Sequence, residues 1–520
     1  MKNRHVRRWS TVALVVLASA GSLMACSSGS SGGSGSATTT VVPVTPPRED
    51  AVSKPIITGP VTGGNGKPVL GPGGFDLASV GYTEEEFFQS GTANSYTSSV
   101  PLGSDGVWNM TTAATAPYTT RIVVRRPTDP SKFNGTVLVE WLNVSGGLDA
   151  GPDWTYTHVE LIRSGYTWVG VSAQSVGIVG GGNALGAALA LKNADAVRYA
   201  SLSHPGDDFS YDMYSQAGAA VWFQSDAVLG GLKPERVVAV GESQSAFRLT
   251  SYVDGIAPLV DIYDGYLIHS SGAVGARFGE GLVPADPTFI RSDLNVPVLN
   301  FSTETDLVGR GLGYERARQP DTDLFRGWEV AGTAHADAYN LGIGDSDNGD
   351  GAGDAALFQA MLTPSAELYG GIISCASPIN TGPHTYVLRS AVVALNDWIR
   401  TGVAPSSRPR IEVSSPTSLA LAATGQVLGG IRTPQVDVPV AVLSGLGQTG
   451  NSFCGLFGTT VPMAVEMYMP QGRQPFIDSW LSSLDEAVTF GAILPADAER
   501  LRSVVQNANL GASGERKVPM

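Results

Sequence analysis

The segment GESQS, residues 241–245, has the residue types of a serine nucleophile held in a sharp turn. It directly follows the apolar run RVVAV and precedes a stretch with helical character, which is the context of a nucleophile elbow. In such a turn the residues two before and two after the serine must be small. Gly241 meets this requirement, and Ser245 is small although glycine is usual there. We therefore predict that Ser243 is a nucleophile; an ordinary strand-to-helix loop is the alternative.

A seryl hydroxyl needs a base, and histidine is the usual one. In a sheet with this kind of elbow the chain order is serine, acid, histidine. Only His335 and His384 follow Ser243 with room for an acid between. His335 comes just after the strand-like run FRGWEV, at the carboxyl end of a strand, where ligands bind in open α/β sheets. We expect His335 to be the base. His384, before a predicted helix, and the other histidines are expected to be structural.

The acid that orients His335 should come from the loop after the strand-like run VPVLNF. Two carboxylic residues stand in this loop, Glu304 and Asp306. Asp306 lies nine residues past Pro297, where hydrolases with this elbow usually place the acid, so we favour it. Glu304 remains the alternative acid.

An oxyanion formed at Ser243 needs two backbone N–H donors. The residue after the nucleophile, Gln244, supplies one at the start of the helix. The second is expected from the glycine-containing loop NVSGG at residues 143–147, with Asn143 or Val144 as the donor. A plain glycine turn is the alternative for this loop. This chemistry needs no cofactor and no metal ion.

The N-terminus resembles an export signal. Residues 1–25 combine four basic residues with a short apolar run, and Leu23-Met24-Ala25 precedes Cys26 as in a bacterial lipobox. We predict cleavage before Cys26, a lipid on this cysteine, and attachment to the outer face of a bacterial membrane in the cell envelope. An ordinary signal peptide is the alternative. Residues 26–50 are rich in Ser, Gly, Thr and Pro and predict a flexible linker.

Charge and cysteine content narrow the function further. The formal net charge of −14 argues against a nucleic-acid partner, which requires a basic surface. The three cysteines are Cys26, Cys375 and Cys454. With Cys26 lipidated, the other two would meet an oxidising compartment, so we predict a Cys375–Cys454 disulfide. Two buried free thiols are the alternative.

Strand-like and helix-like segments alternate along the chain. Strands are predicted at 118–126, 136–142, 166–173, 236–240, 261–269, 296–301 and 325–330, and helices at 156–164, 211–230, 246–253 and 386–400. This alternation predicts an α/β fold with a doubly wound, mostly parallel sheet. We assign residues 51–400 to this core, with insertions, and residues 401–520 to a C-terminal extension packed on it. The acidic loop 345–354 departs from EF-hand spacing and is expected to be solvated.

Seven segments together resemble a family of large bacterial proteins known as alpha/beta hydrolase domain-containing proteins: VEWLNVSGG, GYTWVGVSAQSVGI, SLSHPGDDFSYDMYSQAG, VGESQSAFRLTSYV, STETDL, WEVAGTAHAD and CASPINTGPH. The resemblance covers about residues 55–510. It implies the α/β-hydrolase fold and a serine esterase-like activity, and it supports Ser243 and His335. It leaves Glu304 and Asp306 open, because both lie in a shared segment.

The expected function is hydrolysis of a small-molecule carboxylic ester through an acyl-enzyme intermediate. One alternative keeps the serine, histidine and acid but changes the reaction to acyl transfer or peptide hydrolysis. Another is a non-catalytic envelope lipoprotein that binds a ligand on a hydrolase scaffold.

Overall fold

The computed structural model describes residues 49–71, 74–181, 189–279, 281–309, 311–449 and 453–511. The predicted signal segment, Cys26 with its predicted lipid, and the linker up to residue 48 lie outside these ranges.

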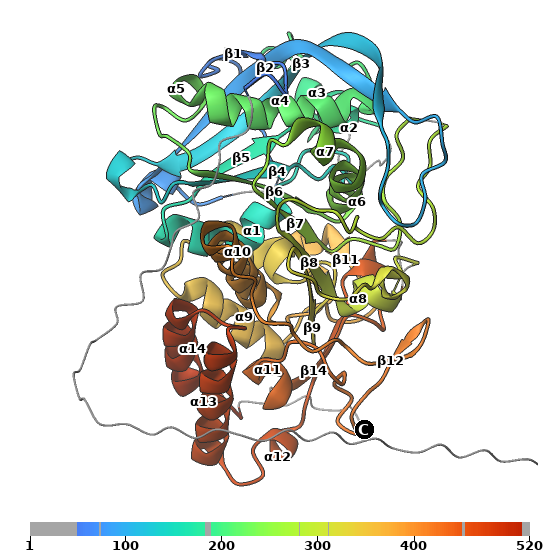
Figure 1. Ribbon diagram of the computed structural model, residues 1–520. Coiled ribbons are helices and arrows are strands. Elements are labelled where there is room, and N and C mark those ends of the chain that lie inside the picture. The colour runs from blue at the N-terminus through green and yellow to red at the C-terminus, as the bar shows by residue number, and fades with distance from the viewer. Residues whose placement is uncertain are drawn as a thin grey trace, which may run out of the picture. The chain divides into compact units, whose positions relative to one another are not determined.

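Nine strands in the described part of the chain form one sheet with the order β1-β2-β3-β5-β4-β6-β7-β8-β9 (Figure 1). The strands are β1 Ile56–Thr58, β2 Tyr82–Thr97, β3 Thr111–Pro127, β4 Thr136–Trp141, β5 Thr167–Val171, β6 Arg236–Glu242, β7 Gly265–His269, β8 Val298–Thr303 and β9 Phe325–Val330. From β5 to β9 the neighbouring strands pair in parallel, whereas β1, β2, β3 and β5 pair antiparallel. The predicted fold class, a mostly parallel α/β sheet, is confirmed.

Helices cover both faces of the sheet. Helices α1 (Pro152–Arg163) and α10 (His384–Thr401) lie on one face, and α4 (Ser210–Phe223) and α6 (Gln244–Ser251) lie on the other (Figure 1). Side chains of β4 alternate accordingly: Leu138 joins the hydrophobic cluster that contains α10 residues, whereas Val137 and Val139 join the cluster that contains α4 residues. Burial on both faces explains why these strands are almost continuously apolar.

The remaining α-helices are shorter or lie near the C-terminus. They are α2 Ser175–Val179, α3 Leu191–Ala194, α5 Ser225–Val228, α7 Ala257–Val260, α8 Glu304–Val308, α9 Ala352–Leu362, α11 Pro434–Asp437, α12 Val465–Tyr468, α13 Arg473–Phe490 and α14 Pro495–Asn507. Among the described residues, none of the helices has both the length and the apolar character that crossing a bilayer requires.

Two sequence expectations are corrected. The helix expected over 211–230 is divided, because Gln224 leaves helical geometry with φ −127° and ψ 29° between α4 and α5. The long strand β2 was not expected from the sequence, and its partner β3 begins seven residues before the predicted strand at 118. The sequence signal is weak here because much of this hairpin is partly exposed and polar.

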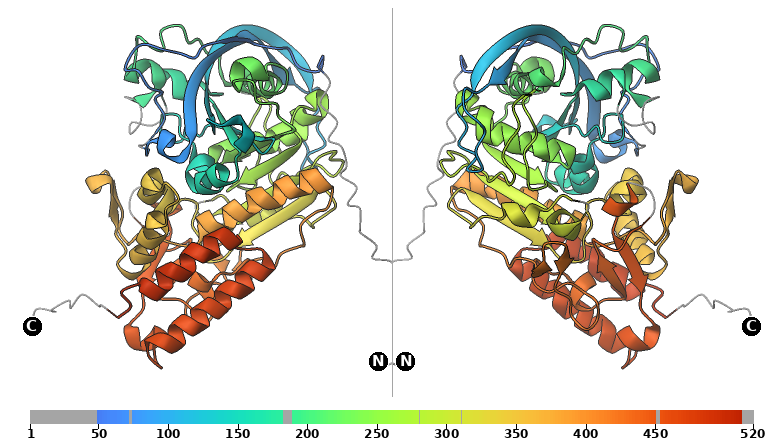
Figure 2. Two further views of the ribbon diagram at one scale, coloured as in Figure 1. Left: turned by 90° about the vertical axis from the view of Figure 1, so that its left-hand side faces the viewer. Right: turned by 90° about the vertical axis from the view of Figure 1, so that its right-hand side faces the viewer.

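The chain after residue 401 packs on the core. Trp480 and Leu484 of α13 and Leu501 of α14 belong to the same hydrophobic cluster as Trp398 of α10. Figure 2 shows α13 and α14 side by side, with α10 next to them. The short strands β14 (Ala441–Ser444) and β15 (Thr459–Pro462) form an antiparallel pair in this region. Four further short strands of the described residues lie outside the main sheet: β10 Glu367–Leu368 pairs with β11 Ile373–Ser374, and β12 Val413–Ser415 pairs with β13 Ser418–Leu419.

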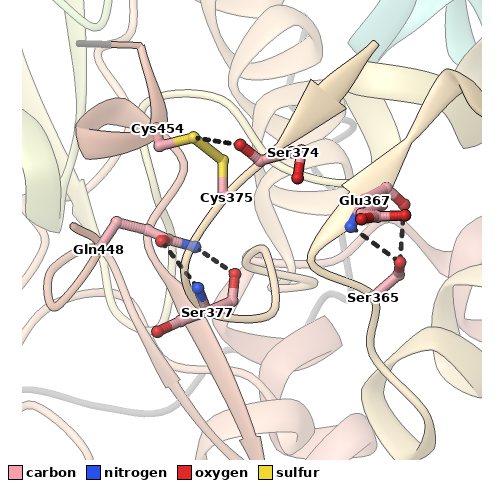
Figure 3. The surroundings of a disulfide bond; sticks show 7 residues. All are labelled: Ser365, Glu367, Ser374, Cys375, Ser377, Gln448 and Cys454. Atoms are coloured by element: carbon pink, nitrogen blue, oxygen red, sulfur yellow. Dashed lines mark hydrogen bonds between the residues drawn. A yellow bond between two sulfur atoms is a disulfide. The ribbon is translucent and has the colours of Figure 1, made fainter. Parts of the chain in front are cut away.

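The predicted Cys375–Cys454 disulfide is confirmed (Figure 3). The side chain of Gln448 forms a second tie between the same two segments: its amide donates to the carbonyl of Ser377 at 2.6 Å and its oxygen accepts from the Ser377 N–H at 3.3 Å. Two residues past Cys454, the carbonyl of Leu456 accepts from the N–H of Ala336 at 3.2 Å. The disulfide therefore lies close to the loop after β9.

Replacing both Cys375 and Cys454 with serine should lower the free energy of unfolding by about 4 kcal/mol, because the bond closes a long loop and restricts the unfolded chain. Urea denaturation without reductant measures this difference. The wild-type protein unfolded with a reductant present is the matched comparison and should behave like the double variant. An unchanged midpoint in both would contradict the expectation.

Candidate active site

Ser243 lies in a strained turn between β6 and α6. Its backbone has φ 58° and ψ −120°, a conformation that residues other than glycine rarely adopt. Its N–H donates to the carbonyl of His269 at 2.9 Å, which ties the turn to the end of β7. A Cβ atom added at Gly241 would lie 3.3 Å from Cβ of Ser245. This close approach explains why both flanking positions hold small residues.

The structure brings together the three residues that the sequence singled out. Nε2 of His335 lies 2.7 Å from Oγ of Ser243, and Nδ1 of His335 lies 2.6 Å from Oδ1 of Asp306. His335 and Asp306 are buried, whereas Ser243 is partly exposed. Asp306 comes from α8 after β8, and His335 from the loop after β9. Parallel pairing of β8 with β9 therefore places acid and base side by side.

Electrostatics favour a charged pair of His335 and Asp306. Burial alone would raise the pKa of Asp306, but the charge and hydrogen bond of His335, together with the hydrogen bonds from Thr303, hold this pKa below its usual value. The N–H and hydroxyl of Thr303 also donate to Oδ2 of Asp306, at 2.7 and 2.8 Å. Burial alone would lower the pKa of His335, yet Asp306 and Glu242 together raise it. The imidazolium form of His335 is thus stabilised by its neighbours.

Glu304, the alternative acid, binds backbone N–H groups instead of the ring of His335. Its carboxylate accepts from the N–H of Gly332 at 2.6 Å and from the N–H of Gly445 at 2.8 Å. Burial raises its pKa to about 7. Glu304 therefore connects the loop that carries His335 to the segment after β14, and Asp306 alone of the two candidates contacts the histidine ring.

One of the two predicted oxyanion donors in the loop after β4 is not available. The N–H of Asn143 donates to the carbonyl of Ala150 at 2.9 Å, so the prediction for Asn143 is wrong. The loop turns back on itself, and this pairing consumes the donor. For Val144 no acceptor of its N–H is found among the described residues. Gln244 opens α6, where the first N–H groups of a helix have no partner within the helix.

Two histidines that sequence reasoning left as structural form a buried chain of hydrogen bonds. Nδ1 of His384 faces the carbonyl of Ala334 at 3.1 Å, its Nε2 faces Nε2 of His269 at 2.7 Å, and Nδ1 of His269 faces Oδ1 of Asp153 at 2.8 Å. A carbonyl only accepts, so His384 donates through Nδ1 and, when neutral, accepts through Nε2. His269 then donates through Nε2 and accepts through Nδ1.

The donor at the far end of this chain must be Asp153 in its protonated form. Burial raises the pKa of Asp153 to about 8 and lowers the pKa of His269 to about 3, which agrees with that assignment. The other end of this series of hydrogen bonds is the carbonyl of Ala334, the residue before His335. The series therefore fixes the backbone next to the base. No residue pattern around Asp153 indicated this role, because the contact joins α1 to β7 across 116 positions.

Carboxylates of the acidic loop 345–354 are occupied by donors of the protein. Asp347 accepts from the hydroxyl of Tyr339 at 2.7 Å, and Asp354 pairs with Arg500 at 2.6 Å. Within the described ranges, no group of three or more His, Cys, Asp or Glu side chains is arranged to hold a metal ion.

The protonated form of Asp153 can be tested by substitution. Asp153→Asn should change the free energy of unfolding by less than about 1 kcal/mol, because an amide N–H can still donate to His269. Asp153→Ala removes the donor from a buried ring and should cost about 1–3 kcal/mol. Chemical denaturation measures both. A loss of about 3–5 kcal/mol in Asp153→Asn would instead indicate a buried ion pair with His269.

A sequence model of the family described as "Alpha/beta hydrolase domain" matches residues 57–503. No functionally curated protein matches the chain.

Among solved structures, a serine hydrolase without a lid from Xanthomonas campestris is similar with a TM-score of 0.25 and 13% identity, over 46% of this chain and 83% of that chain. A fungal esterase from Rhizomucor miehei has a TM-score of 0.23 and 13% identity, over 49% and 81%. A carboxylesterase from Lactobacillus plantarum has a TM-score of 0.23 and 11% identity, over 39% and 71%. The family match spans most of the chain, and this protein therefore belongs to the alpha/beta hydrolase domain family.

Proposed function

We propose that this protein is a serine hydrolase that cleaves small-molecule carboxylic esters through an acyl-enzyme intermediate. The observation that carries the proposal is the alignment of Ser243, His335 and Asp306 at 2.7 and 2.6 Å, with the serine held in a strained turn. In this arrangement the serine hydroxyl is hydrogen-bonded to a base that can take its proton, and a buried acid orients that base.

In the proposed reaction, Oγ of Ser243 attacks the carbonyl carbon of the ester while Nε2 of His335 takes the hydroxyl proton. The oxyanion of the tetrahedral intermediate accepts hydrogen bonds from the N–H groups of Gln244 and Val144. His335 then gives its proton to the leaving alcohol as the ester bond breaks. Water, deprotonated by His335, then attacks the acyl-enzyme. As the bond between the acyl carbon and Oγ breaks, His335 returns this proton to Oγ of Ser243, and the carboxylic acid leaves. Asp306 stabilises the imidazolium at both proton transfers.

Ser243→Ala should lower the turnover of p-nitrophenyl acetate and butyrate by at least about 10³-fold, because it removes the attacking oxygen. Ser245→Ala is the matched control: it removes a buried hydroxyl that has no hydrogen-bond partner, two residues away in the same turn. This control should keep most of the activity. Labelling by a fluorophosphonate probe should follow the same pattern. Undiminished turnover in Ser243→Ala, or a wild-type protein that is not labelled, would refute the proposed function.

The two carboxyl groups near His335 should respond differently to amide substitution. Asp306→Asn should reduce kcat by about 10⁴-fold while the fold remains stable, because a neutral amide replaces the carboxylate that fixes the tautomer of His335 and stabilises its cation. Glu304→Gln should leave kcat within about tenfold of the wild-type value. It should lower the free energy of unfolding by about 1–3 kcal/mol, because one of the two oxygens that accept from buried N–H groups becomes an NH2 group. Steady-state kinetics and urea denaturation of both variants test this. The reverse pattern would identify Glu304 as the acid.

A further inference from the structure

A second carboxyl group faces the histidine from the side of the nucleophile. Glu242 is the last residue of β6, and only 6% of its side chain is exposed. Its Oε1 lies 3.4 Å from Nε2 of His335, the ring nitrogen that also contacts Ser243. Among the described residues, His335 is the one basic group within ion-pair distance of Glu242.

Asn143 holds this carboxyl group in place. Its side-chain amide donates both to Oε2 of Glu242 at 2.9 Å and to the backbone carbonyl of Glu242 at 3.1 Å. The side-chain oxygen of Asn143 accepts from the N–H of Ser145 at 2.7 Å, which fixes the orientation of the amide group. Oε2 of Glu242 is thereby engaged, and Oε1 is left facing His335. Asn143 thus has a role in the site, although its N–H is not an oxyanion donor.

We propose that Glu242 is a positioning residue for the hydrolysis, in which its carboxylate stabilises the imidazolium of His335 from the Nε2 side, as Asp306 does from the Nδ1 side. The inference rests on the proposed function. When the proton of Ser243 moves to Nε2, the new N–H lies within reach of two oxygens, Oγ at 2.7 Å and Oε1 at 3.4 Å. A negative charge at this distance favours the protonated ring.

This contribution must depend on pH. Burial raises the pKa of Glu242 to about 8; the charge of Asp306 adds to this rise, as does Asp153 once it loses its own proton, whereas His335 and Asn143 oppose it. His269 pairs with Glu242 in the neighbouring strand and is neutral. In the free protein Glu242 therefore carries a proton at pH 6 and loses it as the pH passes about 8. The Glu242 carboxylate therefore stabilises the imidazolium of His335 at alkaline pH and not at acidic pH.

The test is the ratio of kcat/KM between the wild type and Glu242→Gln, measured with p-nitrophenyl acetate from pH 6 to 9. The ratio should be below about 3 at pH 6 and rise to about 10–100 at pH 9, since one pKa unit of lost basicity corresponds to a tenfold effect. Glu242→Asp should recover part of the loss. A ratio that does not change with pH would overturn the inference, because a purely structural defect acts equally at every pH.

Asp212→Asn is the matched control. Asp212 is an equally buried carboxyl group that contacts Tyr96, Asn94 and Gln216, and within the described ranges no histidine lies within hydrogen-bond distance of it. The ratio of wild type to this variant should be constant over the same pH range. If Glu242→Gln does not fold, Asn143→Ala serves instead: it releases the carboxyl group from its donor and should give a smaller loss that also grows with pH. A constant ratio in that variant would equally overturn the inference.

A measurement without substrate separates this inference from the proposed function. NMR titration of histidine ring signals should show a step of the His335 signal near pH 8 in the wild type, where Glu242 loses its proton. This step should be absent in Glu242→Gln and retained in Asp212→Asn. If Ser243→Ala abolishes turnover but Glu242→Gln keeps the step near pH 8, the inference on Glu242 fails and the hydrolase function stands. If the wild type turns over no ester but the step depends on Glu242, the proposed function fails alone.

Discussion

The bond between Nδ1 of His335 and Oδ1 of Asp306 is the interaction on which the site depends. It joins two loops that follow neighbouring parallel strands, and it exists only while both loops are held in register. Several contacts far apart in the sequence serve this purpose: Glu304 binds the N–H groups of Gly332 and Gly445, and Leu456 binds the N–H of Ala336. The buried histidine chain holds the carbonyl of Ala334 from behind. The base is therefore fixed by its neighbours on either side in the chain.

Burial and a neighbouring positive charge have opposite effects on the pKa values of the carboxyl groups around His335: burial raises them, and the charge of His335 lowers them. Glu304 accepts two short backbone hydrogen bonds and still has its pKa raised to about 7, because burial outweighs neutral donors. Asp306 is equally buried, but its contact with His335 holds its pKa below the usual value. Glu242, at a longer distance from the same ring, stays near 8. These three buried carboxyl groups thus differ in their tendency to ionise at neutral pH, and this difference matches their different roles.

Much of the arrangement could be predicted from the sequence because the signals are local. The elbow is read from five consecutive residues, and His335 follows from chain order and from its place after a strand. The spacing from Pro297 favoured Asp306 over Glu304 but did not settle the choice, because both lie in the first turn of α8 and the sequence does not give their side-chain contacts. Asn143 was predicted as a backbone donor, but its N–H donates to the carbonyl of Ala150 in a loop that folds back. The role of its side chain was missed because its partner Glu242 lies 99 positions away. Glu242 was missed because its partner His335 lies 93 positions away, and the motif leaves this position unspecified.

The dependence of the His335 loop on residues near 445 and 456 has a consequence for biosynthesis. A polypeptide emerges from its N-terminus, so Ser243, Asp306 and His335 are all present long before the segment that carries Gly445 and Leu456 has been made. A nascent chain at that stage contains every reacting group but lacks two of the contacts that fix the base. The order of synthesis therefore delays completion of the reactive centre until the segment that carries Gly445 and Leu456 has been made.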